Sequence, residues 1–252
     1  MSKKAVVIVS GGTDSVTLAY RLASEGYSLH LLSVDYGQRH LKEVEYARLC
    51  AERLDANFDV ADISGVGRLL KGSALTDELS VPHGHYAAPN MAITGVPNRN
   101  AILLSIAYGV AVAEGAKIVA IGVHAGDHFV YPDCRPEFVE AFDEMQKKAV
   151  EGFGEESLRL YAPFLEWSKA EIVAAGARLG VPYADTWSCY EGGEVHCGRC
   201  GTCVERREAR SRLLACRTRQ CTWRCVLSSG RSSCRYNERR DEEDLSRCRE
   251  DR

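Results

Sequence analysis

The chain has no long hydrophobic run and no visible internal repeat. None of its apolar stretches approaches the roughly 18 residues that a membrane-spanning helix needs. The first stretch, residues 5–9, is also too short for the core of a signal peptide. We therefore expect a cytoplasmic protein without a membrane partner. In that compartment the eleven cysteines indicate metal ligands or free thiols rather than disulfides.

Lysine is absent from residues 205–252, which hold 14 arginines against nine acids and have a net charge of +5. Residues 1–204 carry −8, which leaves −3 for the whole chain. A body of that sign is a poor general binder of nucleic acid, because binding to phosphates depends on a cationic surface. The rest of the composition, 45% hydrophobic and 27% charged, is ordinary for a globular protein. A length of 252 residues fits one domain with an appendage or two small domains.

Residues 10–15, Ser-Gly-Gly-Thr-Asp-Ser, lack the Gly-Lys-Ser/Thr ending of a Walker A loop but have other features of a phosphate-binding loop. The apolar run before them and residues 16–23 after them indicate a buried strand, a tight loop and a helix. Glycine lets the backbone approach an anion closely, and free N–H groups at a helix start favour phosphate. Asp14 could hold a metal ion that bridges phosphates. The alternative is an ordinary glycine-rich turn.

Strand and helix patterns alternate along the chain. Further strands are predicted near residues 28–34, 58–63, 117–123 and 158–161, and further helices near 38–54, 98–114, 136–150 and 168–179, the last capped by Ser168 and ended by Gly180. This order predicts an α/β fold with a doubly wound, mainly parallel sheet and helices on both faces. Residues 72–97 are irregular, which is typical of a functional loop. Ligands of such sheets bind beyond the carboxyl ends of the strands, so residues 10–15, 35–36 and those after Val123 should share one rim.

Four cysteines lie within fifteen residues, at positions 189, 197, 200 and 203. Zinc takes four tetrahedral ligands, and short Cys-x2-Cys steps let one loop supply several of them. A redox Cys-x2-Cys pair with two bystanders is the alternative, and His196 could compete as a ligand. A closed site of four thiolates leaves no position for substrate, so its role should be structural.

The specific signal is the combination of these features with four further segments. They are residues 33–40 (Ser-Val-Asp-Tyr-Gly-Gln-Arg-His), 96–100 (Val-Pro-Asn-Arg-Asn), 122–127 (Gly-Val-His-Ala-Gly-Asp) and 131–138 (Tyr-Pro-Asp-Cys-Arg-Pro-Glu-Phe), followed by Trp-Ser-Cys-Tyr at 187–190. Over about residues 4–208 the chain resembles the 7-cyano-7-deazaguanine synthase family, within the N-type ATP pyrophosphatases. Asn98 departs from the resemblance, because a smaller residue is more usual there.

The resemblance implies a ligase that forms carbon–nitrogen bonds and makes the nitrile precursor of queuosine. It would convert 7-carboxy-7-deazaguanine, ammonia and ATP with Mg²⁺, and would hold one structural zinc ion per chain. No segment resembles a glutaminase, so free ammonium is the expected nitrogen source. The implied partners are small molecules and a second copy of the chain in a homodimer, with no nucleic acid. The expected domains are an ATP pyrophosphatase-like domain at 1–185, a zinc-binding segment at 186–209 and a tail at 210–252.

The resemblance also assigns catalytic and ATP-binding residues by position. Asp14, Lys169 and Arg99 are the catalytic candidates, with both cations in phosphate-binding roles, although Lys169 could be a solvated residue at a helix start. The ATP-binding candidates are Ile8, Val9, Ser10, Gly11, Gly12, Thr13, Asp14, Ser15, Val16, Thr17 and Leu18. The metal candidates are Cys189, Cys197, Cys200 and Cys203.

The substrate-binding candidates are Tyr131, Asp133, Arg135, His124 and Asp127. The first three suit a deazaguanine with a 7-carboxylate, since they offer an aromatic face, an acceptor for the guanine N–H edge and a cation. Asp133 could instead cap the helix that opens at Pro136, and Arg135 could be an ordinary surface charge.

Residues 210–252 have almost no apolar periodicity and are expected to be disordered, as a non-native extension or the product of a shifted frame. A second zinc site at Cys221 and Cys225, or a nucleic-acid-binding tail, is the alternative. Two rival functions stay open: a tRNA-modifying relative such as a thiolase or lysidine synthetase, and a zinc-ribbon binding module without catalysis. The first would need a basic body, and the second leaves residues 10–15 unexplained.

Overall fold

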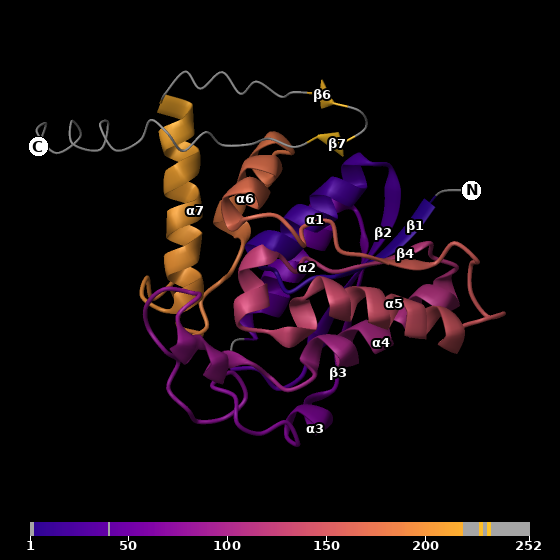
Figure 1. The fold of residues 1–252 in the computed structure, drawn as a ribbon, viewed down its shortest axis with the longest axis horizontal. Coiled ribbons are helices and arrows are strands. Elements are labelled where there is room, and N and C mark those ends of the chain that lie inside the picture. Colours follow the sequence, from indigo (N-terminus) through magenta and orange to yellow (C-terminus); the bar gives the residue numbers. More distant parts are fainter. Residues whose placement is uncertain (1–2, 40, 219–226, 229–230, 233–252) are drawn as a thin grey trace, which may run out of the picture. The chain divides into compact units, whose positions relative to one another are not determined.

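The computed structural model describes residues 3–39, 41–218, 227–228 and 231–232 (Figure 1). The chain divides into two units, residues 1–213 and 214–252. The predicted sites at Cys221 and Cys225, and most of the predicted disordered tail, lie outside the described residues.

Five parallel strands form the sheet of the first unit, in the order β3-β2-β1-β4-β5. Their bounds are Lys3–Ile8 for β1, Tyr27–Asp35 for β2, Asn57–Asp62 for β3, Ile118–Ala120 for β4 and Arg159–Tyr161 for β5. The chain winds outward from β1 to β3 and then continues on the other side of β1. This order confirms the predicted doubly wound parallel sheet and puts the reversal of strand order between β1 and β4.

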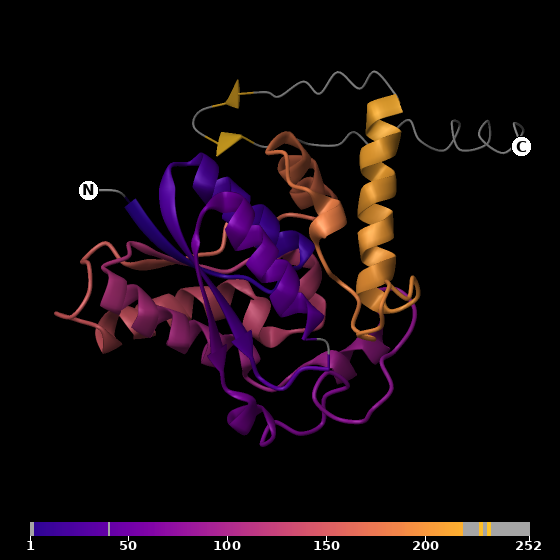
Figure 2. The same cartoon turned by 180° about the vertical axis from the view of Figure 1, so that it is seen from behind.

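Helices cover both faces of the sheet (Figure 1 and Figure 2). The longer ones are α1 (Thr13–Ser24), α2 (Lys42–Leu54), α4 (Arg99–Glu114), α5 (Pro136–Ala149), α6 (Lys169–Arg178) and α7 (Gly201–Thr218). The short ones are α3 (Ser64–Gly67) and the 3₁₀ turns η1 (Pro89–Thr94), η2 (Ala125–Phe129), η3 (Pro132–Cys134) and η4 (Tyr183–Asp185). None of the helices in the described ranges is long and apolar enough to cross a membrane.

Alternation along β1 creates two cores, because successive side chains of a strand point to opposite faces. Val6 and Ile8 pack in the core that includes residues of α4 and α5. Val7 packs with residues of α1, α2 and α6, such as Leu18 and Ile172. The central strand is therefore buried on both sides, which fixes the position of the loop that follows it.

Local signals set several of the helix bounds. The Ser168 side chain accepts from Glu171 N, and the Glu171 carboxylate accepts from Ser168 N at 2.8 Å, which completes a capping box at α6. Gly180 follows the end of α6 with φ +75°, as a helix-ending glycine should. The predicted helix at 38–54 begins only at Lys42, because the Gln38 side chain instead bonds Tyr36 N and Val34 O.

Helix α7 crosses the expected boundary between the zinc-binding segment and the tail. Residues 210–218, at the start of the expected disordered stretch, continue this helix. In the second unit, β6 (Leu227–Ser228) pairs antiparallel with β7 (Arg231–Ser232).

Candidate active site

The loop between β1 and α1 leaves the start of α1 without a cap from the side chain of its N-cap residue. Helix α1 begins at Thr13, and its N-cap residue Gly12 offers no side chain to the first N–H groups of the helix. Ser10 N donates to Ser15 Oγ at 3.2 Å, which shapes the loop from within. Gly11 has φ +74°, and its carbonyl accepts from Trp187 N at 2.9 Å. The uncapped helix start is therefore a ready anion-binding position.

A cavity of about 210 Å³ opens beside this loop. Its wall includes residues at the carboxyl ends of β1, β2 and β4, among them Val9, Val34 and Val123, so the predicted rim is where the cavity lies. The lining includes charged and hydroxyl groups near the loop: Ser10, Thr13, Asp14, Ser15, Lys169, Glu205 and Arg206. It also includes Arg99 and four tyrosines: Tyr36, Tyr86, Tyr131 and Tyr190.

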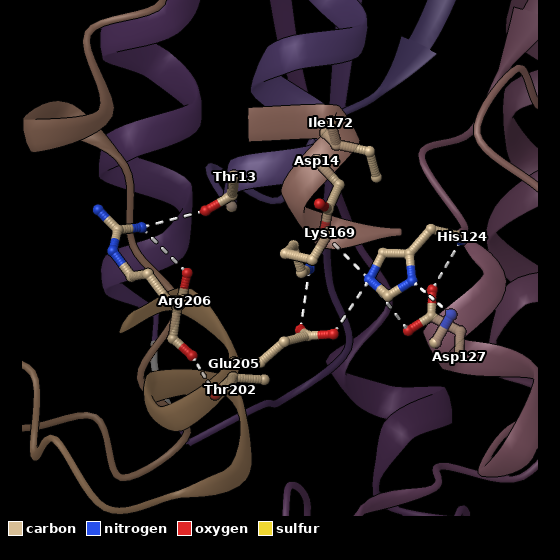
Figure 3. Close-up of polar contacts among 12 residues, drawn as sticks. Thr13, Asp14, His124, Asp127, Lys169, Ile172, Thr202, Glu205 and Arg206 are labelled. Carbon is tan, nitrogen blue, oxygen red and sulfur yellow. Dashed lines mark hydrogen bonds and ion pairs between the residues drawn. The ribbon is translucent and has the colours of Figure 1, made fainter. Parts of the chain in front are cut away.

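Lys169 joins the loop to α7 (Figure 3). Its Nζ lies 2.5 Å from Asp14 Oδ2 and 3.1 Å from Glu205 Oε2. Burial alone would lower the pKa of Lys169, but Asp14 and Glu205 outweigh burial and raise it. Burial raises the pKa of Glu205 against the opposing effect of Lys169. The lysine is therefore a fixed cation at the uncapped end of α1.

His124 lies next to Asp14 and Glu205. It is 1% exposed and does not line the cavity, whereas Asp127 does. Because His124 Nδ1 accepts from Gly126 N at 2.9 Å, the ring proton must sit on Nε2. Nε2 lies 3.6 Å from Glu205 Oε1 and 3.8 Å from Asp127 Oδ1 (Figure 3).

Asp127 has both of its carboxylate oxygens bonded, since it accepts from Tyr86 Oη at 2.8 Å and from His124 N at 3.0 Å. Burial raises its pKa, but His124, Lys169 and these hydrogen bonds lower it overall. Asp127 is therefore an ionised wall residue of the cavity.

Arg206 is a cation at the loop that sequence reasoning missed. Its Nη1 donates to the Thr13 hydroxyl at 3.2 Å (Figure 3). Nη1 also donates to the hydroxyls of Thr186 at 2.7 Å and Ser188 at 3.1 Å, and Nη2 donates to Tyr183 O at 2.5 Å. All of these partners are neutral. Glu205 was missed as well, and the only signal for either residue is its place directly after the cysteine cluster.

The four predicted cysteines converge, with all four Sγ atoms within 4.8 Å of one another. Cys197 Sγ and Cys203 Sγ are 4.0 Å apart, close to the separation of about 3.8 Å implied by tetrahedral zinc with Zn–S bonds of about 2.3 Å. Backbone N–H groups donate to two of the sulfurs, as in Cys200 N to Cys197 Sγ at 3.3 Å. His196 is engaged elsewhere, since its Nε2 accepts from Ser188 N and its ring packs on Trp187.

The cysteine cluster also builds the cavity wall. Trp187, Ser188 and Tyr190 flank Cys189, and Thr202, Glu205 and Arg206 surround Cys203; all six line the cavity. A metal held by the thiolates would therefore fix side chains on both segments.

The predicted substrate-binding residues divide into two groups. Tyr131 lines the cavity, and its hydroxyl lies 2.6 Å from Thr94 Oγ1. Asp133 and Arg135 do not line it. Asp133 Oδ2 accepts from Asn100 N at 2.9 Å, so it caps α4 rather than the helix at Pro136. Arg135 is exposed and donates to His128 O at 3.1 Å.

The predicted ATP-binding residues divide in the same way. Those that line the cavity are Ile8, Val9, Ser10, Gly12, Thr13, Asp14 and Ser15. Val16 and Leu18 instead pack in the core, Gly11 contributes backbone contacts, and Thr17 bonds Thr13 O and Tyr183 Oη.

Several known proteins are similar to this chain. The family model described as "Queuosine biosynthesis protein QueC" matches residues 4–213. A 7-cyano-7-deazaguanine synthase from Brucella anthropi is 59% identical over 206 residues, which are 82% of this chain and 88% of that protein. One from Rhizobium rhizogenes is 57% identical, over 82% of this chain and 86% of that protein. Among solved structures, NMN synthetase from Francisella tularensis is 16% identical with a TM-score of 0.47, covering 77% of this chain and 69% of that one.

Proposed function

This chain belongs to the QueC family of queuosine biosynthesis proteins, and on that premise we propose that it makes 7-cyano-7-deazaguanine from 7-carboxy-7-deazaguanine, ammonia and ATP. The observation that carries the proposal is the 57–59% identity to proteins of that name over 82% of the chain. The cavity beside residues 10–15 supports it, because it joins a phosphate-binding loop to an aromatic wall.

The chemistry fits the groups that face the cavity. A carboxylate is a poor electrophile, so ATP must first convert it to a mixed anhydride with phosphate, which ammonia then turns into an amide. A second activation, at the amide oxygen, allows dehydration to the nitrile. Each activation develops negative charge on phosphate oxygens. The uncapped N–H groups of α1, Lys169 and Arg206 are the donors that would stabilise that charge.

Asp14 suits the Mg²⁺ that accompanies ATP. Its Oδ2 bonds Lys169, but its Oδ1 is buried and has no hydrogen-bond partner in the described part of the chain. A hard cation prefers a carboxylate oxygen of this kind. Bound there, Mg²⁺ would neutralise charge on the phosphates.

Zinc suits the four cysteines, whose spacing and N–H···S contacts match a closed tetrahedral thiolate site. Its contribution would be structural. Cys189 and Cys203 would hold the two wall segments together, and the cavity would depend on the metal without exposing it to substrate.

Asp133 has a supporting role in this proposal. It caps α4, which carries Arg99 into the cavity wall. The homodimer and the cytoplasmic location expected from the sequence stay predictions, which sedimentation and fractionation can test.

A comparison of two substrates distinguishes this function from the tRNA-modifying rival. The purified protein is incubated with ATP and either 7-carboxy-7-deazaguanine with ammonium or unmodified tRNA with lysine and a sulfide donor, and the products are analysed by mass spectrometry. We expect nitrile from the base and no change in the tRNA. Modified tRNA without nitrile would overturn the proposal. If ATP is consumed but neither nitrile nor modified tRNA is formed, both functions are contradicted.

A further inference from the structure

Arg99 is a cation in the cavity wall, and none of the acidic side chains that the structure describes pairs with it. It is the first residue of α4 and is partly buried. In the described part of the chain, its Nε donates to Asn100 Oδ1 at 3.4 Å, and it forms no ion pair. Its electrostatic neighbours are Tyr36, Tyr131, Tyr190 and Cys134. Because removing an unpaired charge from water is unfavourable, such a position favours binding of an anion.

The surroundings of Arg99 suit a planar ring. Tyr36, Tyr131 and Tyr190 line the cavity near Arg99. Tyr86 lines the same cavity, and its ring lies 6.4 Å from that of Tyr131 at 59°. Aromatic side chains of this kind bind flat heterocycles by face and edge contacts.

Two heterocycles take part in the proposed reaction, and their charges distinguish them. The adenine of ATP is neutral, and the proposed function already assigns the triphosphate to Lys169, Arg206 and the start of α1, which lie at the cavity. The deazaguanine carries a carboxylate directly on its ring. A cation among tyrosines matches the second molecule.

We propose that Arg99 binds the 7-carboxylate of the deazaguanine substrate, with the ring against the tyrosines of the same wall. This inference rests on the proposed function. It replaces the phosphate-binding role that the sequence suggested for Arg99 with binding of the substrate carboxylate. A guanidinium can bond both oxygens of a carboxylate in parallel, which fixes the ring in its plane.

Hydrogen bonds of Asn100 fix the first turn of α4, which begins with Arg99. Asn100 N donates to Asp133 Oδ2, and Asn100 Nδ2 donates to Asp133 O at 3.1 Å and to Cys134 Sγ at 3.2 Å. These bonds tie α4 to η3, directly after Tyr131. Asn98, the departure from the family pattern, has φ +58°, a conformation that asparagine tolerates better than most residues.

The test compares the acid with its neutral amide. Dissociation constants of 7-carboxy-7-deazaguanine and 7-amido-7-deazaguanine are measured by calorimetry for the wild type, Arg99→Gln and Arg99→Lys, together with KM for ATP. Loss of a charge-assisted pair predicts about ten- to hundredfold weaker binding of the acid to Arg99→Gln. Binding of the amide should change less than about threefold, and KM for ATP should stay the same, since neither carries the ring carboxylate. Arg178→Gln, an exposed arginine on α6, is the matched control and should change none of these values.

Equal weakening of acid and amide would overturn the inference, because it would show a merely structural role. A raised KM for ATP with unchanged binding of the acid would show that Arg99 binds the phosphates of ATP instead. If Arg99→Gln does not fold, the ratio of the dissociation constants of acid and amide is measured for Arg99→Lys instead. Lysine keeps the charge but cannot form the two parallel bonds. Failure of the wild type to make nitrile would instead refute the proposed function, and the acid-to-amide ratio would still report on Arg99.

Discussion

Gly11→Ala should destabilise the protein by way of α2, which packs directly against the loop. Gly11 has φ +74°, and a Cβ at this position would lie 2.8 Å from Tyr46 Cβ, 2.9 Å from Ala47 N and in overlap with Glu43 O. Two of these three atoms belong to the backbone of a helix, which cannot move aside as a flexible side chain can. The loop or α2 must therefore shift.

The expected loss has two parts. The left-handed conformation costs a residue with a Cβ about 1–2 kcal/mol. Overpacking against a fixed backbone costs about 1–3 kcal/mol more. The sum is about 2–5 kcal/mol, a large share of the roughly 5–15 kcal/mol by which domains are stable. Because Gly11 O also accepts from Trp187 N, the shift should reach the cavity wall and lower activity.

Gly26→Ala provides the matched control. Gly26 has φ +81°, but nothing lies within 4 Å of its added Cβ, so only the conformational part should appear, about 1–2 kcal/mol. Urea unfolding of both variants gives the difference directly. Gly11→Ala should be less stable than Gly26→Ala by about 1–3 kcal/mol, and Gly26→Ala should keep its activity. Equal losses would show that the contact with α2 is not as tight as described.

Four further outcomes are expected. Asp14→Asn should fold but lose about a hundredfold in ATP-dependent turnover, as removal of one charge-stabilising group often does; near wild-type kinetics would remove Asp14 from the reaction. The protein should contain about one zinc per chain, and Cys200→Ser should lower both zinc content and melting temperature; a folded, active, metal-free preparation would contradict this. Burial raises the pKa of Asp143, but hydrogen bonds from Leu160 N and a tyrosine and an ion pair with a lysine outweigh it, so the folded pKa lies below 3.8. The stability that this carboxylate contributes is present above its unfolded pKa and is lost as pH falls through the folded pKa, so the melting temperatures of wild type and Asp143→Asn should converge in acid; a gap independent of pH would refute the assignment. A chain ending at Leu213, where the family match ends, should keep zinc and activity, and a folded but inactive truncated chain would show that the later residues are needed.

The parts of this structure that follow from local sequence were predictable. The doubly wound parallel sheet follows from alternating strand and helix patterns, and the cap at Ser168 follows from a serine three residues before a glutamate. The four cysteines converge because their spacing leaves short turns between ligands. Each of these signals involves residues that are close in the chain.

The site depends on contacts between distant residues, which no local pattern reports. Lys169 meets Asp14 across 155 positions, and Arg206 meets Thr13 across 193. Asp133 has the chemistry of a base-reading carboxylate, but the packing of η3 on α4 turns it to a backbone N–H. Glu205 reaches Lys169 because α7, which follows the cysteine cluster, runs past the loop.

Incorporation of ¹⁵N-labelled ammonium into the nitrile is the decisive measurement of this enzyme's reaction. The purified protein is given 7-carboxy-7-deazaguanine, ATP and labelled ammonium, and the product is identified by mass spectrometry. We expect 7-cyano-7-deazaguanine with a single labelled nitrogen and neither carboxylate oxygen, formed only when ATP is present. Unchanged substrate, or an amide that accumulates and is never dehydrated, would contradict it.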